Sequence, residues 1–406
     1  MNSSPDIHDL IRFVNEAVVY AQREGKESAL IEFSKPNGTF TRGDLYIWAY
    51  DFDGINLAHP WHPEYQGNNK LDLADPDGFH MIAAMRDVAL NGSGYVWYQY
   101  ENPVTEKTEP KIAYVKRVDD TWWLASGIYG NDLRVPDDSP ESVRKRLIDR
   151  VDEAVWYVKE HGEEEALAEF NDPSGPFARN ESYIFAFDMN GTTRAMPFHQ
   201  DRIGRNERDL TDENGVAIGA EKIMVAENGG GFFYYVFHNP AADNTPEFKI
   251  SYVKPASSSL VVGTGTYLLD VPVAFPEEKR EKMKMKVGDA VYYVHDQGKD
   301  AAIREFNDPN GTFSDPEMFI FAFDINGTLL ANPYLPGLVG QNRLNDRDPY
   351  GKYPVQHLIS NGEHGGGYTY YFFADPHSDY KIRLKLGYTE KTEDGLIIGA
   401  GIFPES

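Results

Sequence analysis

The chain carries three copies of one sequence pattern, and this repetition limits its fold more than any other feature. The copies begin with the stretches YIWAYDFDGINLAHP (46–60), YIFAFDMNGTTRAMP (183–197) and FIFAFDINGTLLANP (319–333). Aligned on Gly54, Gly191 and Gly327, they keep later asparagines, glycines and a Lys-x-x-Tyr motif in register. Units of about 120 residues are too long for solenoid repeats, which must stack to bury a face. The pattern therefore predicts three domains, at residues 1–133, 134–272 and 273–406.

Each predicted domain begins with an amphipathic helix and continues as a sheet. Apolar residues recur at helical spacing over 7–21 and 143–158, and Gly25, Gly162 and Gly298 stand where a C-cap glycine would end each helix. Later runs such as GFFYYVF and GYTYYFF are typical of strands, while residues 79–90 fit a further helix. We expect an α+β fold, with one long N-terminal helix on one face of an antiparallel sheet and with loops and a pocket on the other.

The stretch Asp188-Met-Asn-Gly191 invites three interpretations: a calcium loop, a glycosylation acceptor or a hairpin turn. A calcium loop of the EF-hand type needs glycine at its sixth position, whereas here glycine is fourth. Asn-Gly between two apolar runs is instead what a type I′ hairpin turn requires, because both central residues take positive φ. We therefore expect a type I′ turn. The Asn-Gly-Thr sequence is also a glycosylation acceptor, on the condition that the protein is exported.

Composition excludes several classes of function. The 406 residues include 39 Lys and Arg against 64 Asp and Glu, which gives a net charge of −25. Such a charge repels phosphate backbones, so we expect no nucleic-acid partner. The chain has no cysteine, which rules out disulfides and thiolate chemistry. No stretch approaches the ~20 apolar residues that span a bilayer.

No catalytic or cofactor motif stands out. His59 and His62 are three residues apart, but the flanking prolines prevent a helix and no third metal ligand is evident. The glycine-rich stretches NGGGFF and HGGGYT lack the Lys-Ser/Thr of a phosphate-binding loop. The sequence predicts neither an enzyme nor a cofactor or metal site.

The motifs YIWAYDFDG, LAHP, QGNNKLDLADPDG, NGSGYVWYQY and KTEPKIAYVKRVDDTWWLASGIY closely resemble the single Cache domain of the second type. This family provides extracytoplasmic sensor modules of chemotaxis receptors and histidine kinases. The resemblance implies a PAS-like antiparallel sheet that binds small ligands, commonly short carboxylates, and it extends more loosely to the second and third copies. The family usually places one unit between two membrane segments ahead of an output domain. Here three units follow one another with neither membrane segments nor an output domain. The resemblance therefore supports ligand capture more strongly than signalling.

The candidate ligand-binding residues on the sheet are lysines beside tyrosines. Lys111, Lys249 and Lys385 are joined on a neighbouring strand by Tyr98, Tyr235 and Tyr371, and each lysine is followed three residues later by Tyr114, Tyr252 or Tyr388. A buried cation beside phenols would bind a carboxylate through charge-assisted hydrogen bonds. Residues three apart on an unbulged strand face opposite sides, so only one of each lysine and tyrosine pair can line a given pocket. A solvent-facing lysine and a core tyrosine are the equally weighted alternative.

The loop after the opening hairpin supplies further candidates that differ among the copies. They are His59 and Trp61 in the first copy, His199, Arg202 and Arg205 in the second, and Tyr334 and Arg343 in the third. The differences predict dissimilar pockets, or copies that serve only as spacers. The first copy, which follows the family pattern most closely, is the best candidate for a working site.

We therefore expect an extracytoplasmic or secreted sensor-type protein that binds small organic anions without catalysis. A cytoplasmic location stays open, and so does a structural or surface-scaffold role for the repeated domains. A membrane anchor or a signalling partner would have to come from outside this chain.

Overall fold

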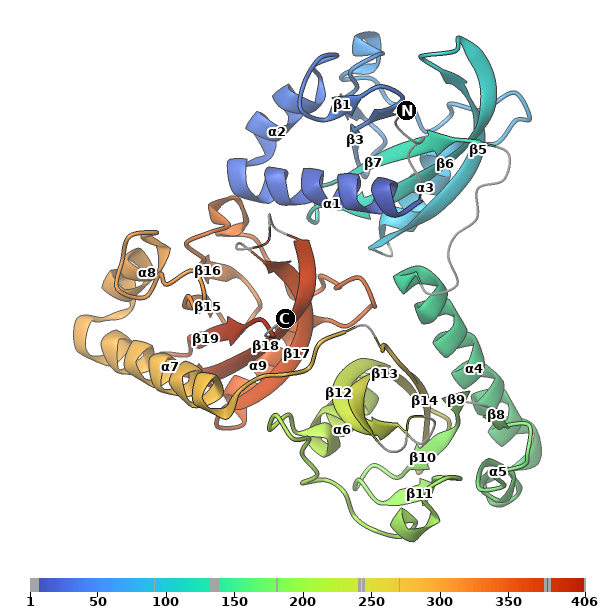
Figure 1. Ribbon diagram of the computed structural model, residues 1–406, viewed down its shortest axis with the longest axis vertical. Coiled ribbons are helices and arrows are strands. Elements are labelled where there is room, and N and C mark those ends of the chain that lie inside the picture. Colours follow the sequence, from blue (N-terminus) through green and yellow to red (C-terminus); the bar gives the residue numbers. More distant parts are fainter. Residues whose placement is uncertain are drawn as a thin grey trace.

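The computed structural model describes residues 7–90, 92–130, 139–179, 182–239, 242, 245–269, 271–375, 378 and 381–404. Within them lie three units, and in each a long helix packs on a five-stranded antiparallel sheet (Figure 1). The expected α+β fold is confirmed. The predicted boundary between residues 133 and 134 lies outside the described residues.

The first unit is built around a sheet with the strand order β4-β3-β7-β6-β5. Its elements are α1 (Ile7–Glu24), α2 (Lys26–Phe33), β1 (Thr41–Arg42), β2 (Leu45–Tyr46), β3 (Trp48–Asp51), β4 (Asn56–Ala58), η1 (Pro63–Tyr65), α3 (Met81–Leu90), β5 (Ser93–Asn102), β6 (Lys107–Arg117) and β7 (Trp122–Tyr129). The helix predicted over 79–90 thus begins at Met81. It packs on β5 and β6.

The second unit repeats this order as β11-β10-β14-β13-β12. Its elements are α4 (Pro140–His161), α5 (Glu163–Phe170), β8 (Ala178–Arg179), β9 (Ser182–Tyr183), β10 (Phe185–Phe187), β11 (Thr193–Ala195), η2 (Gln200–Arg202), α6 (Ile218–Glu227), β12 (Gly231–Asn239), β13 (Thr245–Pro255) and β14 (Val261–Tyr267).

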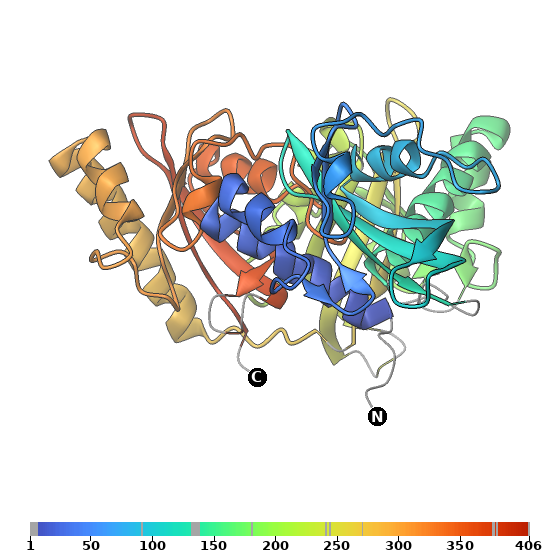
Figure 2. The same ribbon diagram turned by 90° about the horizontal axis from the view of Figure 1, so that it is seen from above.

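The third unit has the order β16-β15-β19-β18-β17. Its elements are α7 (Glu277–Gln297), α8 (Lys299–Asn307), β15 (Phe321–Phe323), β16 (Leu329–Ala331), η3 (Pro336–Leu338), α9 (Pro354–Glu363), β17 (Gly367–Asp375), β18 (Lys381–Lys391) and β19 (Ile397–Ile402). Seen from above, the green α4 and the gold α7 lie at opposite sides of the molecule (Figure 2).

The long helices form where the apolar spacing predicted them. Leu10, Val14 and Ala17 on one side of α1 are fully buried in the core of the first unit. At the start of α4, the Ser139 side chain accepts a hydrogen bond from the backbone N–H of Ser142, which satisfies one of the free donors at a helix N-terminus. Gly162, with φ of +82°, follows the last turn of α4, as Gly25 and Gly298 follow theirs.

The opening hairpins are confirmed, but the predicted type I′ turn is wrong. In the second unit the N–H of Gly191 donates to the carbonyl of Asp188 at 2.9 Å, and the Asp188 carboxylate accepts the N–H groups of Asn190 and Thr192. Only Gly191, with φ of +90°, takes positive φ there. A type I′ turn needs positive φ at two residues, so this is a longer loop with a glycine bulge, held by the aspartate.

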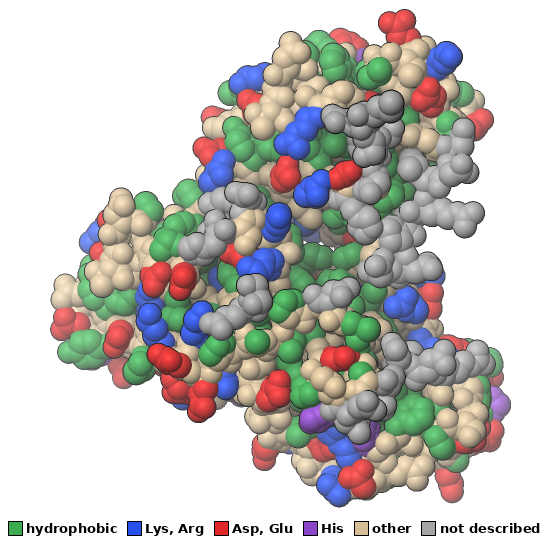
Figure 3. Space-filling model, in the orientation of Figure 1, with side chains coloured by type: hydrophobic (Ala, Val, Ile, Leu, Met, Phe, Trp, Pro, Cys, Tyr) green, Lys and Arg blue, Asp and Glu red, His purple; other side chains and the backbone are tan. Residues whose placement is uncertain are grey.

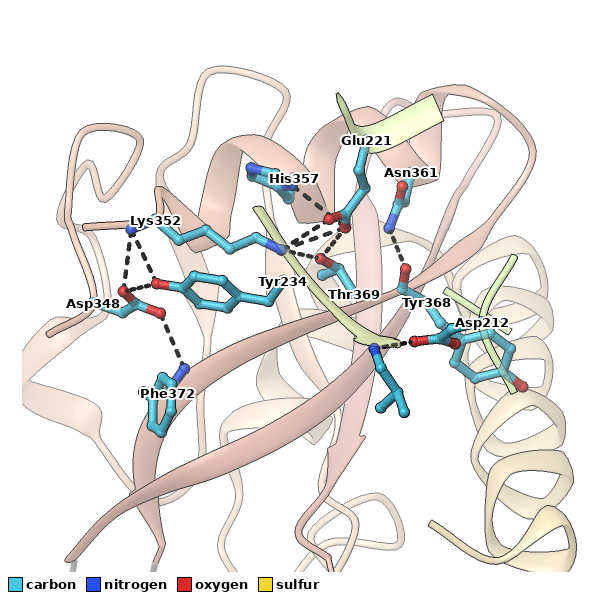
Figure 4. Close-up of polar contacts among 11 residues, drawn as sticks. Asp212, Glu221, Tyr234, Asp348, Lys352, His357, Asn361, Tyr368, Thr369 and Phe372 are labelled. Carbon is cyan, nitrogen blue, oxygen red and sulfur yellow. Dashed lines mark hydrogen bonds and ion pairs between the residues drawn. The ribbon is translucent and has the colours of Figure 1, made fainter. Parts of the chain in front are cut away.

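The second and third units share one hydrophobic core. Phe248 of the second unit packs against Tyr370 of the third, and Tyr234 packs against Phe372, across facing sheets. A buried ion pair lies beside them, in which Lys352 Nζ of the third unit is 3.1 Å from Glu221 Oε2 of the second (Figure 4). These two units therefore form one packed body.

The first unit rests on the other two through helices. Gly337 in η3 lies so close to the backbone carbonyl of Gln22 in α1 that no side chain would fit there. At the start of α4, Arg144 donates to the carbonyl of Ser93 in the first unit and to that of Pro349 in the third, both at 3.1 Å. One arginine of the second unit therefore touches both of its neighbours.

The surface carries mixed charge. On the face shown in Figure 3, Lys and Arg side chains lie among acidic ones, without a single basic stripe. In the part of the chain that the structure describes, no helix is both long enough and apolar enough to cross a bilayer.

Candidate functional site

Three buried lysines occupy the same position in the three sheets. Lys111 lies on β6, Lys249 on β13 and Lys385 on β18, and their exposed fractions are only 2%, 1% and 1%. Tyr98, Tyr235 and Tyr371 are their direct cross-strand partners. The sequence register therefore located the lysine and tyrosine pairs correctly, and the lysines do not face solvent.

The tyrosines three residues after each lysine face the other side of the sheet, as the strand period requires. Tyr114 belongs to the core beneath α1 and donates a hydrogen bond to Glu141 at 3.0 Å. Tyr388 donates to Glu390 at 2.7 Å, and Tyr252 packs on Phe232. Tyr114, Tyr252 and Tyr388 therefore do not join the lysine sites, and their inclusion among the ligand-binding candidates is corrected on this ground.

In the first unit, hydroxyl groups and aromatic rings surround Lys111. Its Nζ donates to Tyr46 Oη at 3.0 Å and to Tyr129 Oη at 2.9 Å. It also lies over the rings of Tyr46, Trp48 and Tyr100, at 4.5 to 5.3 Å from their centroids. Among the described residues, no carboxylate forms an ion pair with it. Burial lowers the pKa of Lys111 well below its usual value, because the charge is removed from water, and the charge of Asp44 offsets only part of this cost.

His59 adds a second hydrogen-bond donor beside this lysine. Its Nδ1 accepts the backbone N–H groups of Trp61 and His62, at 3.2 and 3.0 Å. The neutral ring therefore carries its proton on Nε2. Burial, together with the nearby His62 and Lys111, lowers the pKa of His59 well below its usual value and keeps the ring neutral. Trp61, the other predicted residue of this loop, is partly exposed and meets the ring of Tyr46 edge-on.

The free space between His59 and α3 is small. A cavity of about 20 Å³ remains among Tyr46, Trp48, His59 and Tyr98, with Met81 and Met85 of α3 also in its wall. Two methionines and several rings make this wall apolar, and the polar groups are few. A ligand here would be held by its polar end and surrounded by side chains elsewhere.

In the second unit an acidic side chain already faces the cations. Arg202 Nε is 2.6 Å from Glu207 Oε1, and Lys222 Nζ is 3.4 Å from Glu207 Oε2. Although burial opposes it, the hydrogen bond from Arg202 lowers the pKa of Glu207, so the carboxylate stays charged. Lys249 donates to Tyr183 Oη at 3.1 Å and to Tyr267 Oη at 3.4 Å.

The other two candidates of the second unit differ in their surroundings. Arg205 is exposed and pairs with Asp201 at 3.3 Å, away from Lys249. His199 is half-buried, and its Nε2 has no hydrogen-bond partner within the described part of the chain. It lies beside Arg202 in the wall of a groove of about 560 Å³.

In the third unit the lysine is surrounded by phenyl rings. Lys385 Nζ lies over Phe319, Phe373 and Phe403, at 4.2 to 5.1 Å from the ring centroids. Burial lowers its pKa to about 7. It lines a cavity of about 170 Å³ that also reaches the surface between the first and third units.

The polar groups of the two loop candidates of the third unit already have partners within that unit. The Tyr334 hydroxyl donates to the backbone carbonyl of Ser314. Arg343 pairs with Asp346 and also donates to Gln341. Arg343 lines the same cavity as Lys385, but its guanidinium group is already paired with Asp346.

Sequence reasoning missed Tyr46, Trp48, Tyr129 and Glu207. Tyr46 and Trp48 alternate along the opening stretch, and this period of two places both on the side of the sheet that Lys111 faces. That alternation was a usable signal. Glu207 had no comparable signal, because it belongs to an irregular loop and reaches Arg202 only through the fold.

Cation coordination has no support in the described residues. They contain no group of three or more His, Asp or Glu side chains that could hold a metal ion. Nδ1 of His59 is already occupied by backbone donors.

Two family models match the chain. One, described as "Cache domain", matches residues 138–406, and another, "Single Cache domain 2", matches residues 11–139. Together they account for a double and a single module, or about three units of this kind.

Two curated proteins are similar to part of the chain. They are the sensor histidine kinase MctS of Rhizobium johnstonii, with 36% identity over 91 residues, and the methyl-accepting chemotaxis protein McpP of Pseudomonas putida, with 27% over 93 residues. Each match covers 22% of this chain, and 20% and 17% of the respective relative. The similarity therefore spans about a fifth of the length of these relatives.

Solved structures resemble a third of the chain. A methyl-accepting chemotaxis protein from Vibrio parahaemolyticus has 26% identity and a TM-score of 0.28, over 31% of this chain and 90% of that one. A Cache chemosensory domain solved for its carboxylic acid recognition has 23% identity and a TM-score of 0.28, over 30% and 92%.

Proposed function

Because the chain belongs to the Cache domain family, we propose that it is a sensor-type protein whose first unit binds a small organic anion, such as a short carboxylate, without chemical turnover. The observation that carries this proposal is Lys111. It is a fully buried amine with two hydroxyl partners and, among the described residues, no ion-pair partner.

A carboxylate would supply what the Lys111 site lacks. Its negative charge would offset the cost of burying the ammonium group, and charge-assisted hydrogen bonds are roughly twice as strong as neutral ones. The two oxygens would meet Nζ of Lys111 and Nε2 of His59, both of which are donors. Rings of Tyr46 and Trp48 would cover the carbon skeleton.

The cavity beside His59 and the rings that surround the Lys111 ammonium group favours short ligands. The cavity of about 20 Å³ exceeds the volume of one water-sized sphere only slightly, so binding requires the surrounding loop to adjust. We therefore propose ligands of two to four carbons. Trp61 and the η1 loop, which form the outer side of the site, are the segments that would move.

The three units are proposed to have different roles, within the domain limits 1–133, 134–272 and 273–406. A structural role suits the second unit, because Glu207 already pairs with both Arg202 and Lys222. The phenyl walls around Lys385 suit a more apolar anion in the third unit. We also propose an extracytoplasmic location and an association with a membrane anchor or a signalling partner.

A thermal-shift and calorimetric screen tests the first-unit site. Carboxylates of two to four carbons should raise the melting temperature of the wild-type chain by mass action. Lys111→Met should weaken the binding of the best ligand by about 10- to 100-fold, since a hydrogen bond to a charged group contributes about 1.5 to 3 kcal/mol.

Lys385→Met is the matched control, because it removes an equally buried lysine from the equivalent position of another unit. It should leave the affinity unchanged. If no carboxylate stabilises the well-folded wild type, or if both variants weaken binding equally, the assignment of this site is wrong.

A further inference from the structure

The second and third units pair through matching faces, and the contacts are reciprocal. Tyr234 of β12 donates to Asp348 Oδ1 of the third unit at 2.7 Å (Figure 4). In the opposite direction, Tyr370 of β17 accepts a hydrogen bond from Asn214 of the second unit at 2.8 Å. Each tyrosine immediately precedes the tyrosine that pairs with the buried lysine, so the two occupy the same position in their units.

The loops that receive these tyrosines are equivalent too. The carboxylate of Asp212 accepts the N–H of Val236, and that of Asp348 accepts the N–H of Phe372, so each aspartate ties its loop to the outer strand. Three residues later, Gly215 lies against Tyr368 of the third unit and Gly351 lies against Phe232 of the second. The pair is therefore related by an approximate two-fold axis.

The first unit has the same loop and strand arrangement, but no other unit faces it within the described part of the chain. The carboxylate of Asp75 accepts the N–H of Gln99 on β5 at 3.0 Å, and also those of Asp77 and Phe79 within its own loop. Gly78, which matches Gly215 and Gly351, has open space where a side chain would point.

Trp97 stands where the other units have Tyr234 and Tyr370. Its cross-strand partner is Ile112, as theirs are Ile250 and Leu386. Trp97 is 52% exposed, whereas both tyrosines are 0% exposed. Phe79 is exposed beside it, and a groove of about 350 Å³ runs between these two rings and the loop at Asp75.

We propose that this face of the first unit, made of Asp75, Asp77, Phe79, Trp97 and Gln99, binds the same face of a second copy of the chain. The second copy is the occupant that the molecule itself specifies, because the equivalent faces of the second and third units already pair with each other around a two-fold axis. A two-fold contact is self-complementary and closes after two copies.

The chemistry of the face fits this occupant. In the internal pair a neutral donor, the Tyr234 hydroxyl, meets an aspartate of the facing loop. Trp97 carries a neutral N–H donor in its indole ring, and Asp75 of the second copy is the corresponding acceptor. Exposed aromatic residues in a cluster mark interaction sites, and tryptophan commonly dominates the energy of such interfaces.

Sedimentation equilibrium of the full chain tests the proposal. The wild type should show a concentration-dependent mass that rises toward twice the 45.9 kDa of the chain. Trp97→Ala should raise the dimer dissociation constant at least tenfold, whereas Trp156→Ala, which removes an equally exposed tryptophan from α4, should not change it. A wild type that stays monomeric at about 100 μM, far above the micromolar affinity typical of weak specific dimers, overturns the proposal. So does an equal effect of both variants.

A single cysteine gives an independent readout, because the chain has none of its own. Gln99→Cys places a thiol near the proposed axis, and mild oxidation should yield a disulfide-linked dimer. Asp149→Cys, on the exposed side of α4, should yield little. Equal cross-linking of the two variants would indicate random collision and would contradict the two-fold contact.

Discussion

Lys111 and Lys249 occupy equivalent positions on β6 and β13, but in the second unit the carboxylate of Glu207 pairs with the cations Arg202 and Lys222. The contrast arises at one position in the loop that follows the opening hairpin. The backbone N–H groups of Lys70, Glu207 and Arg343 each donate to the carbonyl of the glycine in the opening hairpin, so the three residues are equivalent. Their side chains are basic, acidic and basic. One loop residue therefore decides whether Arg202 and Lys222 have an internal counter-ion.

The third unit extends the contrast. Lys385 meets phenyl rings where Lys111 meets hydroxyl groups. Hydrogen bonds to the hydroxyl groups replace part of the hydration of an ammonium group, yet burial still lowers the pKa of Lys111 well below its usual value, as it lowers that of Lys385. The three equivalent lysines therefore lie in three different electrostatic environments.

The largest effect is expected from Glu207→Gln. This change removes the counter-ion of Arg202 and Lys222, and leaving buried charges unpaired costs about 3 to 5 kcal/mol. Urea denaturation should show this loss of stability, and added sulfate should restore part of it by occupying the freed site.

Asp201→Asn is the matched control for Glu207→Gln, since Asp201 forms an exposed ion pair in the same loop. It should change stability little, because exposed pairs contribute little. If Glu207→Gln behaves like this control and sulfate has no effect, then Glu207 does not act as an internal counter-ion.

A pH-dependent effect is expected from Lys385→Met. The pKa of Lys385 is about 7 in the folded chain, below its ordinary value of 10.5. Between these values the unfolded chain holds a proton that the folded chain has released, so this lysine makes stability rise with pH, by up to about 1.4 kcal/mol per pH unit. Below pH 7 both states are protonated and the contribution is constant. The variant should therefore lose this rise between pH 7 and 9 in thermal unfolding, and an unchanged profile would show that Lys385 stays charged.

The smallest effect concerns proton uptake at Lys111. Because burial lowers the pKa of Lys111 and an anion would raise it again, ligand binding should take up a proton. The affinity for a carboxylate should then fall with rising pH, by at most about tenfold per pH unit. Calorimetry in buffers of different ionisation enthalpy measures the proton directly. Affinity that is constant up to pH 9, with no proton uptake, would mean that Lys111 is charged before the ligand arrives.

Local patterns predicted much of each unit, and long-range contacts account for what they missed. The apolar spacing of α1 and the cross-strand place of Tyr98 beside Lys111 follow from helix and strand periods. The turn type was missed because Asp188 binds backbone N–H groups with its side chain, which stabilises a longer loop. The burial of Tyr234 and the exposure of Trp97 depend on which unit faces them, and no periodicity within one copy carries that information.

Arg144 has a mechanical consequence for the whole chain. It donates to the backbone of β5 in the first unit and to the loop before α9 in the third, while its own helix belongs to the second. Rotation of the first unit relative to the third must break one of these hydrogen bonds or carry α4 along. Movement of β5, at the edge of the first sheet, is therefore coupled to movement of α4, the longest helix of the second unit.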